Sequence, residues 1–398
     1  MGNIFDYLTW RGDLTFTQDP PNAVDALIFS TLTYVGYGET AERPPESAAS
    51  LRRCAEEFFA LENPESRVRS KKDMELLRCA AATARFGQCG LCLYRSVLLP
   101  EQETQFAAMT FLLDDGSMFL AYRGTDNSLV GWKEDFNMTF QQTIPAQRLA
   151  QEYIRQAALA YTAPMRVAGH SKGGNLAVFA AARCSPTVRK RILTVYNNDG
   201  PGFTKYMIGD PGYNAIVPRI RTYIPQSSVI GMLLEHEEPF LVIRSKSVGL
   251  MQHDPYSWEV EGPNFLQVAE VTESSQFLDA TIKNWFASMT NQERNRLVEV
   301  LYSLLTTGEV ENAVDIFQPK NIRAYVKTLS SDADMRHILS TEFQGLLEAA
   351  KKARASMGEA KELPPNQSEE LKVESEELGV RSEELRVNTP HSTLYTPH

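Results

Sequence analysis

The sequence has little of what marks several large classes of protein. None of its apolar runs approaches the ~18–20 residues that a membrane-spanning helix requires. Lysine and arginine (40) are outnumbered by aspartate and glutamate (50), and the net charge of −10 argues against a nucleic-acid partner, because phosphate binding needs clustered basic side chains. The opening residues lack a basic region followed by an apolar stretch, so we expect no secretory signal.

Cysteine is also scarce. The five cysteines are odd in number and scattered, which favours a reducing, cytoplasmic environment over a disulfide framework: Cys54, Cys79, Cys89, Cys92 and Cys184. Cys89 and Cys92 have CxxC spacing but stand alone, and one pair does not complete a four-ligand zinc site. We therefore expect two half-buried structural thiols, no metal and no organic cofactor.

Hydrophobic periodicity predicts an α/β domain over residues 1–275. Helical patterns come first, strand-length runs follow, and an Asp-Asp-Gly turn at 114–116 joins two of the strands into a hairpin. Strands and helices then alternate, which indicates a mostly parallel sheet flanked by helices. The expected helices lie near 22–36, 46–61, 72–85, 147–161 and 173–183, and the expected strands near 91–99, 105–113, 118–122, 165–168, 192–196, 219–224 and 239–245.

The pattern changes after residue 275. Residues 276–358 are expected to form a helical appendage, with helices at 291–305, 310–317, 321–327 and 334–355. From 359 to 398 the chain is rich in glutamate and repeats Ser-Glu-Glu-Leu with a period of seven, at Ser368, Ser375 and Ser382. Three short repeats that include a glycine make a weak coiled coil, so the tail is predicted to be disordered.

The strongest chemical motif is Gly169-His170-Ser171-Lys172-Gly173, which fits G-x-S-x-G. A predicted strand precedes it and a predicted helix follows it, as a nucleophile elbow requires. Gly169 and Gly173 are the small residues that let strand and helix backbones approach each other. The pattern predicts Ser171 as a nucleophile at a helix N-terminus, where free N–H groups stabilise negative charge.

Other segments carry a family resemblance. The chain has Tyr122-Arg123-Gly124-Thr125, then Trp132 with Asp135 three residues later, then Gly-His-Ser-Lys-Gly-Gly from Gly169. These resemble the F-R-G-S/T, W-x-x-D and G-H-S-x-G-G motifs of the class 3 (fungal-type) lipases, which are α/β-hydrolases. Residues 6–13 and 253–258 resemble a bacterial branch of those enzymes, and the resemblance covers about residues 1–265.

The resemblance implies an oxyanion hole formed by Thr125 and the backbone N–H of Lys172. A tetrahedral acyl intermediate needs two donors near one point, which agrees with this assignment. Trp132 lies either on a lid or in the core, where it would anchor a helix. The Lys172 side chain is either solvated or directed at an anionic group of the substrate.

The catalytic base is sought among six histidines. His170 is adjacent to the nucleophile and packs under the elbow, His337 lies in the appendage, and two others lie in the tail. His236 and His253 remain, and His253 is preferred because it follows a predicted strand by a short loop.

The acid must follow the nucleophile and precede the histidine in this fold. Class 3 lipases carry an aspartate after the next strand, but here residues 224–230 hold no carboxylate. Asp199 ends the strand at 192–196 and is therefore the predicted acid, since sheet folds place catalytic groups at the C-terminal ends of strands. Glu235, Glu237 and Asp254 are the alternatives.

Together these residues predict a serine hydrolase that cleaves carboxylic esters, lipid or lysolipid esters included, through an acyl-enzyme on Ser171. A small-molecule or lipid ester is the expected partner, with peripheral membrane contact. Two alternatives stay open: a catalytically inactive scaffold on the same fold, and a thioesterase with the same triad.

Overall fold

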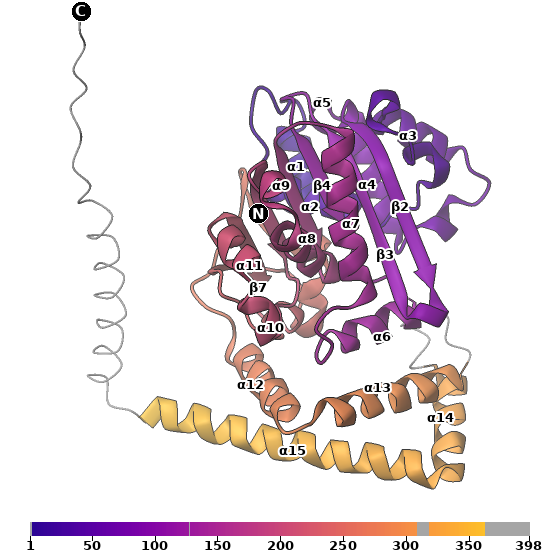
Figure 1. Ribbon diagram of the computed structural model, residues 1–398, viewed down its shortest axis with the longest axis vertical. Coiled ribbons are helices and arrows are strands. Elements are labelled where there is room, and N and C mark those ends of the chain that lie inside the picture. The colour runs from indigo at the N-terminus through magenta and orange to yellow at the C-terminus, as the bar shows by residue number, and fades with distance from the viewer. Residues whose placement is uncertain (1, 127, 309–317, 363–398) are drawn as a thin grey trace, which may run out of the picture.

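The structure is a computed structural model that describes residues 2–126, 128–308 and 318–362 (Figure 1). An eight-stranded sheet has its strands in chain order: β1 Ala49–Ser50, β2 Gly90–Leu99, β3 Thr104–Leu112, β4 Met118–Tyr122, β5 Met165–His170, β6 Ile192–Asn198, β7 Ile220–Pro225 and β8 Phe240–Ile243. Neighbours from β1 to β4 are antiparallel, and neighbours from β4 to β8 are parallel. With helices on both faces, this is an α/β-hydrolase-like fold, as predicted.

Helices of the sheet region include the five expected near 22–36, 46–61, 72–85, 147–161 and 173–183, together with others that were not expected. They are α1 Ile4–Arg11, α2 Ala23–Leu32, α3 Leu51–Phe59, α4 Lys71–Ala82, α5 Ala84–Gly87, α6 Leu129–Asn137, α7 Pro145–Ala160, α8 Lys172–Arg183, α9 Pro186–Arg189, α10 Lys205–Ile208 and α11 Pro211–Ile216. A small hairpin follows the sheet, with β9 at Val260–Glu261 and β10 at Asn264–Phe265. The helix expected at 46–61 begins only at Leu51, because Ser50 belongs to β1 and caps α3 through the Arg53 N–H.

Alternation along the strands divides the interior into two cores. On β4, Phe119 and Ala121 face one core, whereas Met118, Leu120 and Tyr122 face the other. Successive side chains of a strand point to opposite faces, so each central strand supplies both cores. Helices α1, α2 and α4 cover the first face, and α7 and α8 cover the second.

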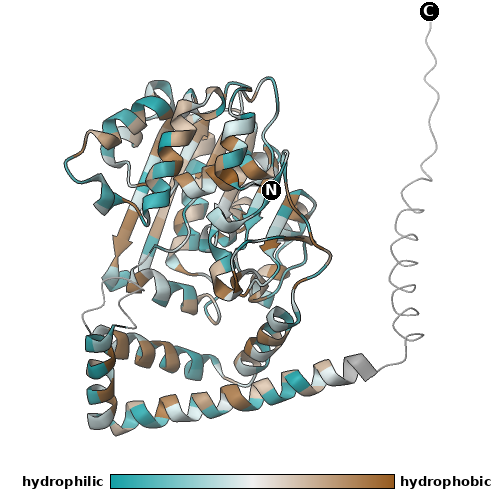
Figure 2. Cartoon of the chain, turned by 180° about the vertical axis from the view of Figure 1, so that it is seen from behind, coloured by the Kyte–Doolittle hydropathy of each residue, from teal (hydrophilic) through white to brown (hydrophobic). Residues whose placement is uncertain are grey.

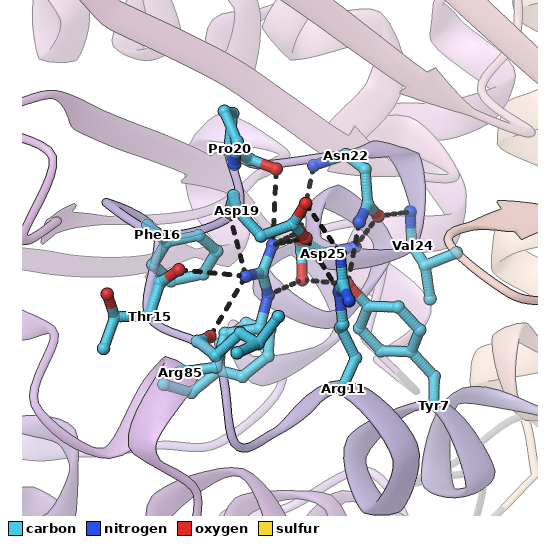
Figure 3. A network of polar contacts seen from close by, with 12 residues as sticks. Tyr7, Arg11, Thr15, Phe16, Asp19, Pro20, Asn22, Val24, Asp25 and Arg85 are labelled. Carbon is cyan, nitrogen blue, oxygen red and sulfur yellow. Dashed lines mark hydrogen bonds and ion pairs between the residues drawn. The ribbon is translucent and has the colours of Figure 1, made fainter.

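A buried polar network fixes the N-terminal helices (Figure 3). The Arg85 guanidinium donates to both carboxylate oxygens of Asp25, at 2.8 and 2.5 Å, and both side chains are fully buried. The Tyr7 hydroxyl also donates to Asp25, at 2.8 Å, and Asp25 accepts the Asn22 N–H at the start of α2. The network therefore sets the position of α2, which packs against β5 beneath the candidate site.

The helical region comprises α12 Glu273–Ala287, α13 Asn291–Thr306, α14 Pro319–Ser331 and α15 Ala333–Glu362. Figure 1 shows these helices as a frame along one side of the sheet region, with α13 near α6 and α15 closing the frame. In Figure 2 the strands are largely apolar, whereas the frame alternates between hydrophilic and hydrophobic residues. The helix expected at 310–317 and the tail beyond 362 lie outside the described residues, and the boundary near 275 stays a prediction.

Within the described part of the chain, we find no helix long and apolar enough to cross a membrane. Cys89 and Cys92 are buried rather than half-buried, and each thiol donates to a backbone carbonyl, of Arg85 and Thr110 respectively. Both are free thiols.

Candidate active site

Ser171 lies between β5 and α8 in a strained backbone conformation. Its φ is 59° and its ψ −136°, an arrangement that costs a non-glycine residue about 1–3 kcal/mol. The Ser171 N–H donates to the Asn198 carbonyl at 2.9 Å, and its carbonyl accepts from the Gly174 N–H at 2.8 Å. These contacts hold the sharp turn that directs the side chain away from the helix axis, as a nucleophile elbow does.

The two motif glycines are required sterically. A Cβ on Gly169 would lie 2.0 Å from the Gly173 carbonyl carbon and oxygen, and a Cβ on Gly173 would lie 2.2 Å from the Tyr122 carbonyl oxygen. Such distances are far inside van der Waals contact, so neither position accepts a larger residue without moving backbone. The elbow thus depends on β4, β5 and α8 approaching each other where side chains are absent.

Asp199 and His253 lie together at the end of the sheet. The His253 Nδ1 is 2.6 Å from the Asp199 Oδ2, although 54 residues separate them in the chain. Asp199 follows β6, is 1% exposed and has a φ of 53°. Its other oxygen, Oδ1, accepts from the Ser228 hydroxyl at 2.5 Å. A buried carboxylate with two partners is well suited to fix the tautomer and orientation of an imidazole.

The turn at Asn197–Gly200 explains why this carboxylate is available. The Asn197 side chain, not that of Asp199, accepts the Gly200 N–H at 2.9 Å. The Asp199 N–H donates to the Tyr223 carbonyl of β7 at 2.8 Å, so the turn is tied to the neighbouring strand. The Asp199 side chain is therefore free to extend toward the loop that carries His253.

The alternative acid and base residues lie elsewhere. Glu235 and Glu237 are exposed, and Asp254 pairs with Lys72 at 3.0 Å. His236 contacts Glu238 through Nδ1 at 3.1 Å.

A second histidine supports the loop of His253. The His170 Nε2 donates to the His253 backbone carbonyl at 2.8 Å, and its Nδ1 accepts from the Tyr34 hydroxyl at 3.1 Å. Burial, reinforced by the charge of His253, holds the pKa of His170 well below its usual range, so its ring is neutral. The two imidazoles lie 4.6 Å apart between ring centroids. His170 does pack beneath the elbow, but it also anchors the backbone of His253.

Ser171 and His253 line the same cavity, which has a volume of about 570 Å³. Because Asp199 occupies the Nδ1 side of His253, Nε2 is the ring nitrogen left for the serine. Among the described residues no direct hydrogen bond joins the two side chains. Such contacts are often loose without substrate and shorten in the complex.

Thr125 and Asp135 also line the cavity. Thr125 follows β4 and donates its hydroxyl to the Asp135 Oδ2 at 2.5 Å. Burial raises the pKa of Asp135 to about 6, and the nearby Lys172 ammonium limits the rise. Since the Thr125 hydroxyl has one proton and Asp135 accepts it, the Thr125 backbone N–H is the remaining donor for an oxyanion.

The Lys172 side chain is neither solvated nor directed at substrate. It is 1% exposed, and its Nζ donates to Glu134 Oε2 at 2.8 Å and to two oxygens of Gln105. Glu134 also accepts the Gln105 and Ala146 N–H groups. This buried ion pair joins α8 to α6 and β3, and it leaves the backbone N–H as the group of Lys172 that is relevant to an oxyanion.

The rest of the cavity is apolar and draws on the helical region. Trp132 and Phe136 of α6, Leu233 and Leu234 line one part, and Ile282, Trp285 and Phe286 of α12 line another. The volume lies within the range of roughly 300–1,000 Å³ that is usual for small-molecule sites. Trp132 therefore contributes to the cavity wall, and α12 is part of the site rather than remote from it.

Sequence reasoning missed several residues of this site. Tyr34, Ser228 and Glu134 hold His170, Asp199 and Lys172, yet each lies 29 or more residues from its partner. No local pattern marks such partners. Within the described ranges, no group of three or more His, Cys, Asp or Glu side chains is placed to hold a metal ion.

A comparison with solved structures finds lipases of low sequence identity. A triacylglycerol lipase structure is 14% identical, with 55% of this chain and 79% of the other covered and a TM-score of 0.34. The Rhizomucor miehei lipase propeptide complex is 16% identical, with 55% of this chain and 67% of the other covered and a TM-score of 0.33. A mutant form of MDLA from Penicillium cyclopium is 13% identical, with 61% of this chain and 83% of the other covered and a TM-score of 0.35. A search of curated protein sequences found no match.

The sheet order, the helices on both faces and the strained turn after β5 define an α/β-hydrolase-like protein. A family model described as Mbeg1-like matches residues 80–303, which is more than half of the chain. The chain belongs to the Mbeg1-like family.

Proposed function

We propose that this protein is a serine hydrolase that cleaves carboxylic esters, lipid or lysolipid esters among them, through an acyl-enzyme on Ser171. The observation that carries the proposal is one cavity that joins a serine in a strained elbow with a histidine whose far nitrogen meets a buried carboxylate. Three groups in these relations are what nucleophilic acyl transfer requires.

The mechanism follows from the two ends of the His253 ring. Nδ1–H donates to Asp199, so Nε2 carries the lone pair that accepts the Ser171 proton as Oγ attacks the ester carbonyl. The Thr125 and Lys172 N–H groups stabilise the oxyanion. His253 then protonates the leaving alcohol, and a water molecule activated by the same nitrogen releases the acid and restores Ser171.

The test is Ser171→Ala in the full chain. Loss of a triad serine leaves a residual of about 10³–10⁴-fold over water, so we expect ester hydrolysis and labelling by a fluorophosphonate probe to fall to background while the thermal midpoint stays near wild type. Hydrolysis that persists in the variant would contradict the nucleophile. Wild-type protein that neither labels nor hydrolyses a panel of aryl esters and thioesters would favour a scaffold.

The panel also separates esterase from thioesterase. Matched oxygen and sulfur esters of one acyl chain differ only in the leaving group. We expect the oxygen ester to be turned over. If the probe labels Ser171 but only the thioester is turned over, the protein is a thioesterase rather than an esterase.

We also propose peripheral contact with a lipid surface, in a protein of the cytoplasm where its free cysteines persist. The loop that leads to His253 exposes three apolar side chains, Val248 (80%), Leu250 (64%) and Met251 (65%), and Leu250 also lines the cavity. Exposed apolar residues grouped at a cavity mouth are typical of membrane-interaction sites.

Vesicle co-sedimentation tests this contact. Val248→Ser combined with Met251→Ser should reduce binding to phosphatidylcholine vesicles severalfold, because two apolar contacts with the acyl boundary are lost. Leu159→Ser, on α7 and 73% exposed, is the matched control. Equal binding by all three proteins would refute the proposed contact.

A further inference from the structure

A second cavity adjoins the one that contains Ser171. Its volume is about 490 Å³. Tyr34, Arg69 and Asp126 line both cavities, so the two share a boundary. The second cavity is therefore adjacent to the site of Ser171.

The two cavities differ in chemistry. Away from the boundary, the Ser171 cavity is lined mainly by leucine, isoleucine and aromatic side chains. The second cavity is lined by three arginines against two carboxylates: Arg67, Arg69 and Arg123, with Glu42 and Asp126. Three positive and two negative charges leave it at +1, whereas the whole chain carries −10. The lining of the cavity is thus net positive on an acidic protein, although Asp73, outside the lining, pairs with Arg69.

The three arginines of the second cavity differ in their contacts. Arg123 is 12% exposed, and its guanidinium donates to Asp126 at 3.2 Å. Its Nε is buried and has no partner among the described residues. The Arg69 guanidinium stacks on the Tyr34 ring at 4.0 Å and pairs with the buried Asp73 at 3.5 Å, whereas Arg67 is exposed. Planar guanidinium groups match phosphate oxygens in paired hydrogen bonds.

The ammonium group of Lys172, the other cation near Ser171, is already used in hydrogen bonds within the protein. Lys172 donates to Glu134 and Gln105 and is buried, so it has no free donor for an anionic substrate. The arginines of the second cavity are then the side-chain cations through which an anion beside Ser171 would be recognised.

We propose that the ester cleaved at Ser171 carries a phosphate headgroup. The acyl chain occupies the apolar cavity, and the phosphate lies in the second cavity against Arg67, Arg69 and Arg123. This inference rests on the proposed hydrolase function. The acyl–oxygen bond breaks, the acyl group moves to the Ser171 Oγ, and the phosphate-bearing alcohol leaves with the proton from His253. Water then releases the fatty acid, and the phosphate ester itself stays intact.

The test compares two substrates that differ only in the phosphate: 1-hexanoylglycerol and 1-hexanoylglycerol 3-phosphate. The short chain keeps both monomeric, so a lipid surface does not contribute. We expect kcat/KM to be at least tenfold higher for the phosphate, chiefly through a lower KM, because binding to the headgroup is the same in ground and transition states.

Arginine variants assign the preference to the cavity. Arg67→Gln and Arg69→Gln should each reduce the preference at least threefold, again through KM, and the double variant should abolish it. Arg155→Gln, on α7 and 59% exposed, is the matched control and should keep the full preference. Arg67 is exposed, so Arg67→Gln carries the test even if Arg69→Gln fails to fold.

Inorganic phosphate separates a headgroup from a free anion. Under the proposal, phosphate competes weakly with the phosphate-bearing ester and loses this effect in Arg67→Gln. Inhibition by phosphate without any preference between the two esters would mean a free-anion site and would overturn the proposal.

Labelling of Ser171 by the fluorophosphonate probe distinguishes the two levels of inference. If the wild type labels and hydrolyses both esters equally, the headgroup proposal is wrong while the hydrolase remains. If Ser171 neither labels nor supports turnover of either ester, the proposed function itself fails.

Discussion

Replacement of Asp199 by asparagine tests the proposed site most sharply, because the structure dictates how the new amide is oriented. The Asp199 Oδ1 accepts the Ser228 hydroxyl proton at 2.5 Å, and the Ser228 oxygen in turn accepts the Gly231 N–H at 3.0 Å. The Ser228 hydroxyl proton therefore needs an acceptor on residue 199 if this hydrogen bond is to be kept. In Asp199→Asn the amide oxygen must stay on the Ser228 side, which directs the NH₂ group at His253 Nδ1.

That orientation puts two donors against each other unless His253 changes its tautomer. Nδ1 then becomes the acceptor, the proton moves to Nε2, and the ring no longer accepts the Ser171 proton. We expect kcat to fall by about 10⁴, as in other serine triads that lose the same carboxylate. At about 1.36 kcal/mol per factor of ten, this corresponds to roughly 5 kcal/mol of transition-state stabilisation.

The assay is steady-state hydrolysis of an aryl ester, together with the rate of fluorophosphonate labelling. Asp254→Asn is the matched control, because Asp254 follows His253 directly but pairs with the exposed Lys72, and it should change kcat less than twofold. The thermal midpoint of both variants should stay near wild type. A loss below a hundredfold in a folded Asp199→Asn protein would refute the tautomer argument.

Two further predictions concern stability. Because burial raises the pKa of Asp135 to about 6, the folded state holds this proton more tightly than the unfolded chain does. The stability of the wild type should therefore fall relative to Asp135→Asn as the pH rises from about 4 to 6, and level off above. Melting curves of both proteins across that range check this prediction, and a constant difference would contradict the raised pKa. Arg85→Met leaves Asp25 buried without its cation and should lower the unfolding free energy by about 3–5 kcal/mol in chemical denaturation, with much of the loss recovered in the double variant with Asp25→Asn. A loss under 1 kcal/mol would mean that the pair is solvated.

The fold was largely predictable because its signals are local. The turn at 114–116 joins β3 to β4 as expected, with Gly116 at a φ of +79°, and the βα alternation after β4 predicted the parallel strands. Burial of the cysteines was underestimated, since Cys89 and Cys92 are covered by segments that are remote in sequence. How deeply a strand is covered depends on what packs over it, and a single strand pattern does not contain that information.

The environment of the candidate residues was less predictable for the same reason. The sequence singles out Lys172 as a cation beside the nucleophile, but its charge is neutralised by Glu134, which comes from α6. The sequence gives no reason to connect Ser171 with Trp285. Trp285 lies on α12, and the course of the chain after β10 brings this helix to the cavity. Such contacts depend on tertiary packing, whereas motif spacing reports only on neighbours along the chain.

The choice of Asp199 as the candidate acid follows from the geometry of the sheet edge. Strands β4 to β8 are parallel, so their C-terminal ends bring Thr125, Ser171, Asp199 and the loop of His253 to one edge. The end of β7 offers Ser228 instead of a carboxylate, and that hydroxyl donates to Asp199. The position after β7 thus supports the carboxylate rather than supplying it. With the acid one strand nearer to Ser171, His253 must be held from a second side, which is the contact that His170 makes with its carbonyl.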